Sequence, residues 1–185
     1  MKFSAVSKQV SGGFTLIETL MVIALALLIA TLAVPSFVLW QVRDQVDSRA
    51  RTFAATLGFA RSEAVRRGVP VTVCRTDQAR QCLGVAQPCG GAHDWSCGWA
   101  VIAEPAGAQK VLRAQSSELD VRISGVLSDL TFTPPAGQLI GRFRRFEIAP
   151  RVASQEMQGP RFQRCIRIAA GGRVRLAEGS CGARP

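Results

Sequence analysis

The feature that most constrains this chain is a glutamate inside an apolar segment near the N-terminus. Residues 20–34 hold one polar side chain, Thr31. The apolar segment that begins at Phe14 is long enough to span a hydrocarbon core of about 30 Å. Glu18 lies within it, where an acidic side chain costs about 2.5–3.5 kcal/mol at mid-bilayer and normally marks function. The nearest group that could neutralise it is the α-amino group made by cleavage after Gly13.

Two more ordinary kinds of segment fit these residues less well. A secretory signal has a basic leader, an apolar region of about 7–15 residues and a small-residue cleavage site beyond it. Residues 30–36 offer only a weak site of that kind. Neither a signal peptide nor a plain transmembrane anchor accounts for Glu18. The glutamate therefore favours a segment whose own N-terminus is created by cleavage.

The residues around this glutamate carry a specific resemblance. Gly13, Phe14 and Glu18, with Thr-Leu-Ile between the last two, closely resemble the N-terminal signature of type IV pilins and type II secretion pseudopilins. The resemblance implies that a prepilin peptidase removes residues 1–13 as a leader. It also implies that Phe14 becomes the N-methylated N-terminus of the mature chain.

The same resemblance implies two successive environments for residues 14–39. The segment first anchors the subunit in bacterial inner-membrane lipid, as a single pass with the globular part in the periplasm. It then joins the core of a pilus or pseudopilus beside other pilins. In that filament Glu18 would pair with the ammonium group of Phe14, from its own subunit or from a neighbour.

A helical spacing of apolar residues continues past the anchor. It predicts one long helix over 14–67, because Gly68 followed by Pro70 is a stop signal. The apolar positions recur at steps of three and four, which places them along one side of the helix. They are Val46, Ala50, Phe53, Leu57, Ala60 and Ala64.

Beyond the helix, short β-like runs alternate with turn residues. They lie at 69–75, 99–103, 110–113, 121–124, 130–133, 143–148, 165–169 and 173–176. The pattern predicts an α+β, type IV pilin-like fold. Its long N-terminal helix packs on a C-terminal antiparallel β domain at 68–185.

Six cysteines all lie beyond the membrane segment, at Cys74, Cys82, Cys89, Cys97, Cys165 and Cys181. No Cys-x-x-Cys pair occurs, so a zinc-finger site is not indicated. Cys89, His93 and Cys97 could be imagined as metal ligands, but disulfides are the simpler explanation in a periplasmic domain. Fifteen connectivities are possible, and we expect the local pairs 74–82, 89–97 and 165–181.

Several later stretches narrow the resemblance. The chain is similar to the FimT/GspH family of minor pilins and pseudopilins at 60–68, 71–74, 98–101, 111–113, 131–134 and 172–176. The cysteine-containing insertion at 82–97 departs from the family pattern. Some FimT-like members bind DNA in natural transformation through a C-terminal Gly-Arg-x-Arg motif, whereas GspH-like members build the pseudopilus of type II secretion. Gly172, Arg173 and Arg175 match the motif, so the resemblance implies that they contact DNA.

Aliphatic and arginine residues alternate on both sides of this motif. Burying the aliphatic side chains turns the arginines to the opposite face of a hairpin. Aligning the two apolar sets places Ile168 opposite Val174 and Arg167 opposite Arg175, with a three-residue loop at 170–172. Like charges in such positions are unfavourable by about 0.2–1 kcal/mol. A phosphate would relieve the repulsion, and the planar guanidinium suits it.

The basic excess of the chain is concentrated near the motif. The formal net charge is +10, and from Arg142 to the C-terminus ten arginines accompany three glutamates. We expect Arg142, Arg144 or Arg145 to aid the hairpin in binding double-stranded DNA. Phosphate contacts would make that binding largely independent of sequence. A solvated strand face, or a contact with acidic subunits, would account for the same residues without DNA.

The sequence therefore favours a minor pilin of a type IV pilus that binds DNA nonspecifically for uptake in natural transformation. The alternative is a GspH-like minor pseudopilin of type II secretion that does not bind DNA. An enzyme is disfavoured, because His93 is the only histidine and no catalytic constellation can be assembled. No cofactor or metal is implied.

The leader gives a first prediction. We expect the mature chain to begin at Phe14 with a methylated amine, because the basic leader joins directly to the glycine and glutamate of the signature. Mass spectrometry of the N-terminal peptide from membrane-extracted protein checks this. A mature terminus near Ser36 would instead identify an ordinary signal peptide.

Overall fold

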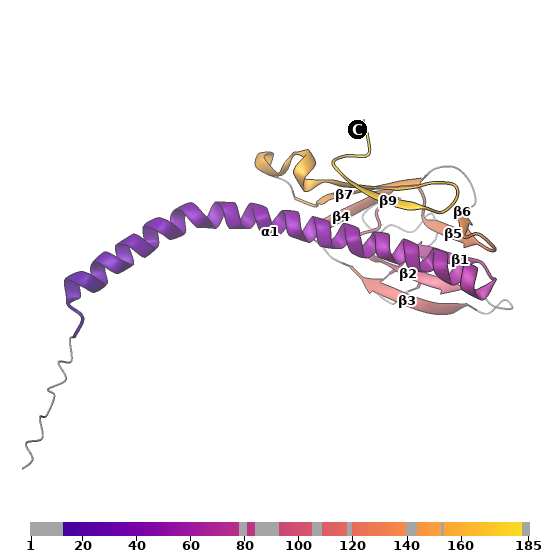
Figure 1. The fold of residues 1–185 in the computed structure, drawn as a ribbon, viewed down its shortest axis with the longest axis horizontal. Coiled ribbons are helices and arrows are strands. Elements are labelled where there is room, and N and C mark those ends of the chain that lie inside the picture. Colours follow the sequence, from indigo (N-terminus) through magenta and orange to yellow (C-terminus); the bar gives the residue numbers. More distant parts are fainter. Residues whose placement is uncertain are drawn as a thin grey trace, which may run out of the picture. The chain divides into compact units, whose positions relative to one another are not determined.

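Two compact units make up the chain. The computed structural model describes residues 13–77, 81–83, 93–104, 109–117, 120–139, 144–152 and 154–182. The units are Met1–Leu39 and Trp40–Pro185. The helix α1 (Leu16–Arg67) begins in the first unit and ends in the second, which also holds every described strand (Figure 1).

Apolar side chains cover the first part of α1 on all sides. Leu16, Met21 and Leu27 are each more than half exposed. A helix that is apolar all round needs an apolar environment outside the chain. Among the described helical residues, no single helix has the length and apolarity of a membrane span. When α1 is divided at its bend into Leu16–Thr31 and Ser36–Arg67, the two parts together meet both criteria.

The predicted apolar stripe of the helix is the centre of the core in the second unit. Its six residues are all fully buried: Val46, Ala50, Phe53, Leu57, Ala60 and Ala64. They form one hydrophobic cluster with residues from both β-sheets. The spacing of the stripe therefore correctly predicted the face of α1 on which the β domain packs.

A five-stranded antiparallel sheet packs on this stripe. Its strand order is β3-β2-β1-β5-β6. The strands are β1 (Val71–Arg75), β2 (Gly98–Ala103), β3 (Lys110–Ser116), β5 (Asp129–Thr133) and β6 (Gln138–Leu139). The two-residue β6 was not predicted from the sequence.

A four-stranded antiparallel sheet completes the second unit, in the order β4-β7-β8-β9. Its strands are β4 (Val121–Gly125), β7 (Arg144–Pro150), β8 (Arg164–Ile168) and β9 (Val174–Glu178). Two short 3-10 turns, Gln155–Met157 and Pro160–Phe162, lie between β7 and β8. All eight predicted strands are present with bounds shifted by at most three residues, and the predicted α+β fold is confirmed.

Four aromatic rings join the helix to the sheets. Phe53 of α1 lies edge-on to Trp95, Trp99 and Phe146, with ring centroids 5.6, 4.8 and 4.9 Å away. Trp95 also donates a hydrogen bond from Nε1 to the carbonyl oxygen of Leu127 at 2.8 Å. Edge-to-face pairs add to the free energy gained by burial. Both tryptophans are thus core residues.

The C-terminal end of α1 is held by one carboxylate. Arg66 and Arg67 both donate to Glu63, at 2.6 and 2.5 Å from its Oε2 atom. Hydrogen bonds from Arg66 and then Arg67 lower the pKa of Glu63 to about 2. The arrangement favours the ionised glutamate, so its stabilising effect is present above the ordinary pKa and is lost as the pH falls toward 2.

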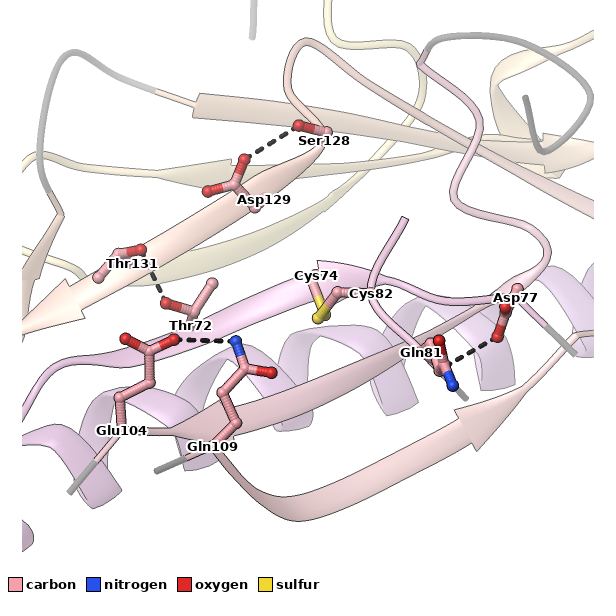
Figure 2. Close-up of a disulfide and its surroundings, with 10 residues drawn as sticks. All are labelled: Thr72, Cys74, Asp77, Gln81, Cys82, Glu104, Gln109, Ser128, Asp129 and Thr131. Atoms are coloured by element: carbon pink, nitrogen blue, oxygen red, sulfur yellow. Dashed lines mark hydrogen bonds between the residues drawn. A yellow bond between two sulfur atoms is a disulfide. The ribbon is translucent and has the colours of Figure 1, made fainter. Parts of the chain in front are cut away.

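A disulfide closes a tight return of the chain beside β1. Cys74 and Cys82 are bonded, as predicted, with Cα atoms 5.6 Å apart (Figure 2). The backbone nitrogen of Gln81 donates to Asp77 Oδ1 at 2.8 Å, which tightens the same return. The insertion is therefore pinned covalently to a central strand of the five-stranded sheet.

The aromatic cluster gives a second prediction. Phe53→Ala should lower the free energy of unfolding by about 3–5 kcal/mol, because it removes a fully buried ring that three other rings contact. Urea denaturation of the detergent-solubilised chain, followed by circular dichroism, measures this. Phe59→Ala is the control, since Phe59 lies on the same helix and is only partly buried. Equal losses in the two variants would contradict a central role for Phe53.

Candidate functional site

The C-terminal hairpin has the register that its sequence predicts. Across β8 and β9, Ile168 lies opposite Val174 and Arg167 lies opposite Arg175. The loop is residues 170–172, closed by a hydrogen bond from the Gly172 nitrogen to the Ala169 oxygen at 2.8 Å. The side chains of Arg167 and Arg175 are therefore directed to the same, outer face of the sheet.

A third arginine extends this pair onto the neighbouring strand. Arg145 of β7 lies opposite Arg167. The three residues Arg145, Arg167 and Arg175, which we call the arginine row, run across three adjacent strands and are all exposed. Strands lie about 4.8 Å apart, so the outer two Cα atoms are about 10 Å from each other. Arg173, also exposed, precedes Arg175 by two residues and extends the row along the hairpin.

Few opposing groups lie beside the arginine row. Within the described residues, Arg145, Arg173 and Arg175 form no ion pair, and Arg167 donates from Nη2 to the carbonyl oxygen of Cys181 at 3.3 Å. Glu147, two residues after Arg145, lines a hollow of about 170 Å³ with it. Among the described residues, Glu147 is the one carboxylate that shares this hollow with the row, so the face is basic and favours an anionic partner.

A disulfide fixes the segment that follows the hairpin. Cys165 of β8 is bonded to Cys181, as predicted, with Cα atoms 5.0 Å apart. The bond places the carbonyl of Cys181 beside Arg167. Cys97 is also disulfide-bonded, and the predicted partner Cys89 lies outside the described residues.

Gly172 has a packing role that the motif alone does not reveal. Its φ is +76°, and a Cβ atom there would lie 2.0 Å from the carbonyl oxygen of Gly137. The nitrogen of Leu139 donates to the oxygen of Ala170 at 3.0 Å. The tip of the hairpin is thereby attached to β6 of the other sheet. Gly172 is buried, so its contribution to the motif is steric.

Two of the other predicted arginines are not part of the row. Arg144 lies opposite Ile168 on the core side of β7 and is half-buried, with its Nε atom buried and without a hydrogen-bond partner among the described residues. Adjacent residues of a strand face opposite sides, so Arg144 and Arg145 cannot both join the outer face. Arg142 lies outside the described residues.

The N-terminal site residues lie in the other unit. Phe14 is 81% exposed, and Glu18, also exposed, lies in the first turn of the helix, where its backbone nitrogen donates to the Thr15 oxygen at 3.1 Å. Gly13 precedes the helix. Cleavage after Gly13, methylation of Phe14 and the pairing of Glu18 remain predictions.

The long N-terminal helix and the two antiparallel sheets packed on its second half define a pilin-like filament subunit. Residues 49–172 match the family described as Type II transport protein GspH. Because this match covers more than half of the chain, the protein belongs to the GspH family of minor pilins and pseudopilins.

Solved structures show the same fold at low sequence identity. Two crystal structures of the type IV minor pilin FimU from Pseudomonas aeruginosa are 23% and 22% identical, with TM-scores of 0.51 and 0.54. They cover 71% and 73% of this chain and 91% and 90% of their own. The minor pseudopilin EpsH from the type II secretion system of Vibrio cholerae is 12% identical, with a TM-score of 0.51, covering 77% of this chain and 99% of its own. No curated protein matches the sequence.

The two loop glycines give a third prediction. Gly172→Ala should destabilise the domain by at least about 1–2 kcal/mol, because alanine disfavours this positive φ and its Cβ would clash with Gly137. Gly171→Ala is the matched control, since a Cβ atom added at Gly171 would meet nothing within 4 Å. Urea denaturation compares them. A Gly172→Ala protein as stable as the control would contradict the packing role.

Proposed function

We propose that the arginine row and Arg173 bind the phosphate backbone of double-stranded DNA, and that the protein acts as a minor pilin in DNA uptake during natural transformation. The single observation that supports this most is the register of β7, β8 and β9. It brings Arg145, Arg167 and Arg175 side by side on one exposed face.

Repulsion among the guanidinium groups of the arginine row favours the binding of an anion at this face. Two like-charged cross-strand neighbours each cost a few tenths to about 1 kcal/mol in the folded domain. Phosphates placed between the guanidinium groups would convert this repulsion into charge-assisted hydrogen bonds, often bidentate. Binding of a polyanion would thus offset the repulsion among these arginines.

The same geometry supports binding without sequence preference. The arginines project from the face of a four-stranded sheet, and not from an isolated helix or two-stranded ribbon of the kind that enters the major groove to read base edges. Phosphate contacts fix position and carry no direct sequence information. We therefore expect similar affinity for unrelated duplexes and a steep dependence on salt.

The N-terminal features complete the proposal. The prepilin peptidase would remove residues 1–13, and residues 14–39 would hold the subunit in inner-membrane lipid before assembly with other pilins. Glu18 would then neutralise the ammonium group of Phe14 within the filament. The domain at 68–185 would present the arginine row from the pilus.

A second function has support of its own. The family that the chain belongs to is described as a type II transport protein, and a minor pseudopilin of type II secretion need not bind DNA. In that role the arginine row would contact acidic surfaces of neighbouring subunits. Measuring DNA binding separates the two functions.

The arginine row gives a fourth prediction. Arg175→Gln and Arg145→Gln should each weaken binding to unrelated duplexes equally, and each should lower the slope of log K against log salt by about 1. Thermal stability should stay unchanged or rise slightly, because each change relieves repulsion with Arg167. Fluorescence anisotropy with the full chain in detergent micelles, and thermal melts by circular dichroism, measure the two effects.

Arg161→Gln is the matched control, since it removes one exposed charge from the 3-10 turn before β8, away from the row. It should leave the salt slope almost unchanged. If the wild-type chain shows no salt-sensitive binding, or if a double Arg145→Gln, Arg175→Gln variant binds as well as wild type, the secretion pseudopilin is the better description.

A further inference from the structure

The outer edges of the two sheets are protected to very different degrees. The edge of β4 is covered by residues 93–95, with the Trp95 nitrogen donating to the Ile123 oxygen at 2.7 Å and the Gly125 nitrogen donating to the His93 oxygen at 2.9 Å. The short β6 donates to the hairpin tip through Leu139. The strand β3 is interrupted by a bulge in its pairing with β2 and carries Lys110. Bulges, lysines and covering segments are the usual ways in which proteins block a sheet edge.

Within the described residues, the edge of β9 carries no bulge, lysine or covering segment; its charged side chains are Arg175 and Glu178. Its pairing with β8 runs through five residues without a register shift. The Ala169 nitrogen donates to the Arg173 oxygen and the Gly179 nitrogen donates to the Gln163 oxygen, so the odd-numbered residues of the strand bond to β8. In an antiparallel pair the alternate residues point their backbone groups away. Val174, Leu176 and Glu178 therefore present their N–H and C=O groups outward.

A groove of about 600 Å³ lies along this open edge. Its walls are residues 176–178 of β9 and one side of α1 that includes Trp40 and Asp44. Three of the charged groups on the walls pair with one another: Asp47 accepts from Arg164 Nε at 2.9 Å and from Arg51 Nε at 2.7 Å. These contacts hold the wall of the groove in place, and the backbone donors and acceptors of β9 lie along it together with the side chains of Asp44 and Glu178.

We propose that an extended segment of another subunit adds to β9 as a fifth antiparallel strand and lies in this groove. Strand addition of this kind uses main-chain hydrogen bonds for affinity and alternate side chains for specificity. The inward side chains of the segment would contact the half-buried Leu176 and Val174 and are therefore apolar. Its outward side chains would lie directly beside Arg173 and Arg175 and are therefore acidic.

The charge pattern also disfavours one occupant. A second copy of this chain, presenting its own β9, would bring Arg173 and Arg175 against the same residues. Like charges opposite one another disfavour that pairing. The fitting partner is a different subunit with an alternating acidic and apolar strand.

A labelled peptide tests the proposal with the full chain in detergent micelles. The probe is a fluorescein-labelled heptapeptide that alternates valine and glutamate, and anisotropy measures its binding. Antiparallel addition places the valine amides against β9 and the glutamate amides toward solvent. N-methylation of the valine amides should weaken binding at least about tenfold, whereas N-methylation of the glutamate amides should have little effect.

Variants of the protein supply the second arm. Leu176→Pro removes an outward N–H from an edge strand, a position where proline is tolerated. It should weaken binding of the peptide at least about tenfold. Circular dichroism checks that this variant folds, and the comparison of the two methylated peptides holds even if it does not. Arg175→Gln should weaken binding but keep the difference between those peptides. Absence of peptide binding, or equal binding of the two methylated peptides, would overturn the proposal.

Discussion

Burial of one side of α1 is the interaction on which the rest of the second unit depends. The stripe from Val46 to Ala64 packs against residues of both sheets at once, with Phe53 among the rings of Trp95, Trp99 and Phe146. Neither sheet could bury its inner face without the helix. The stripe therefore fixes which face of β7, β8 and β9 is inner, and by exclusion it sends Arg145, Arg167 and Arg175 outward.

Features set by local sequence patterns could be predicted, whereas features set by long-range contacts could not. The helical stripe, the strands and the register of the hairpin follow from spacing along nearby residues, and all are present. Two of the three local disulfides that we expected, among fifteen possible connectivities, are also present. Alternation with Phe146 and Ile148 could have shown that Arg145 rather than Arg144 faces outward. The place of β7 beside β8 could not be read from the sequence, because strand order depends on tertiary packing. The close approach of Gly172 to Gly137 joins segments far apart in the chain, so it could not be predicted from the sequence either.

The basic face and the open edge of β9 share a residue. Arg175 belongs to the arginine row through β8, and it also lies beside any strand added to the other edge of β9. A duplex and an acidic strand would therefore compete for one guanidinium group while differing in what else they use. DNA would need Arg145 on the far side of the row, and a strand would need the backbone of Leu176. If both proposals hold, DNA binding by this sheet would depend on whether the strand of a neighbouring subunit is in place.

The disulfide between Cys165 and Cys181 has a mechanical consequence. Arg167, Arg173 and Arg175 all lie inside the covalent loop that it closes. A tension applied to DNA bound at these residues would enter the chain within that loop and reach β8 along two covalent paths. The hydrogen bonds between β8 and β9 would not have to carry the load alone. A hairpin built in this way can hold a pulled ligand without its edge strand peeling from the sheet.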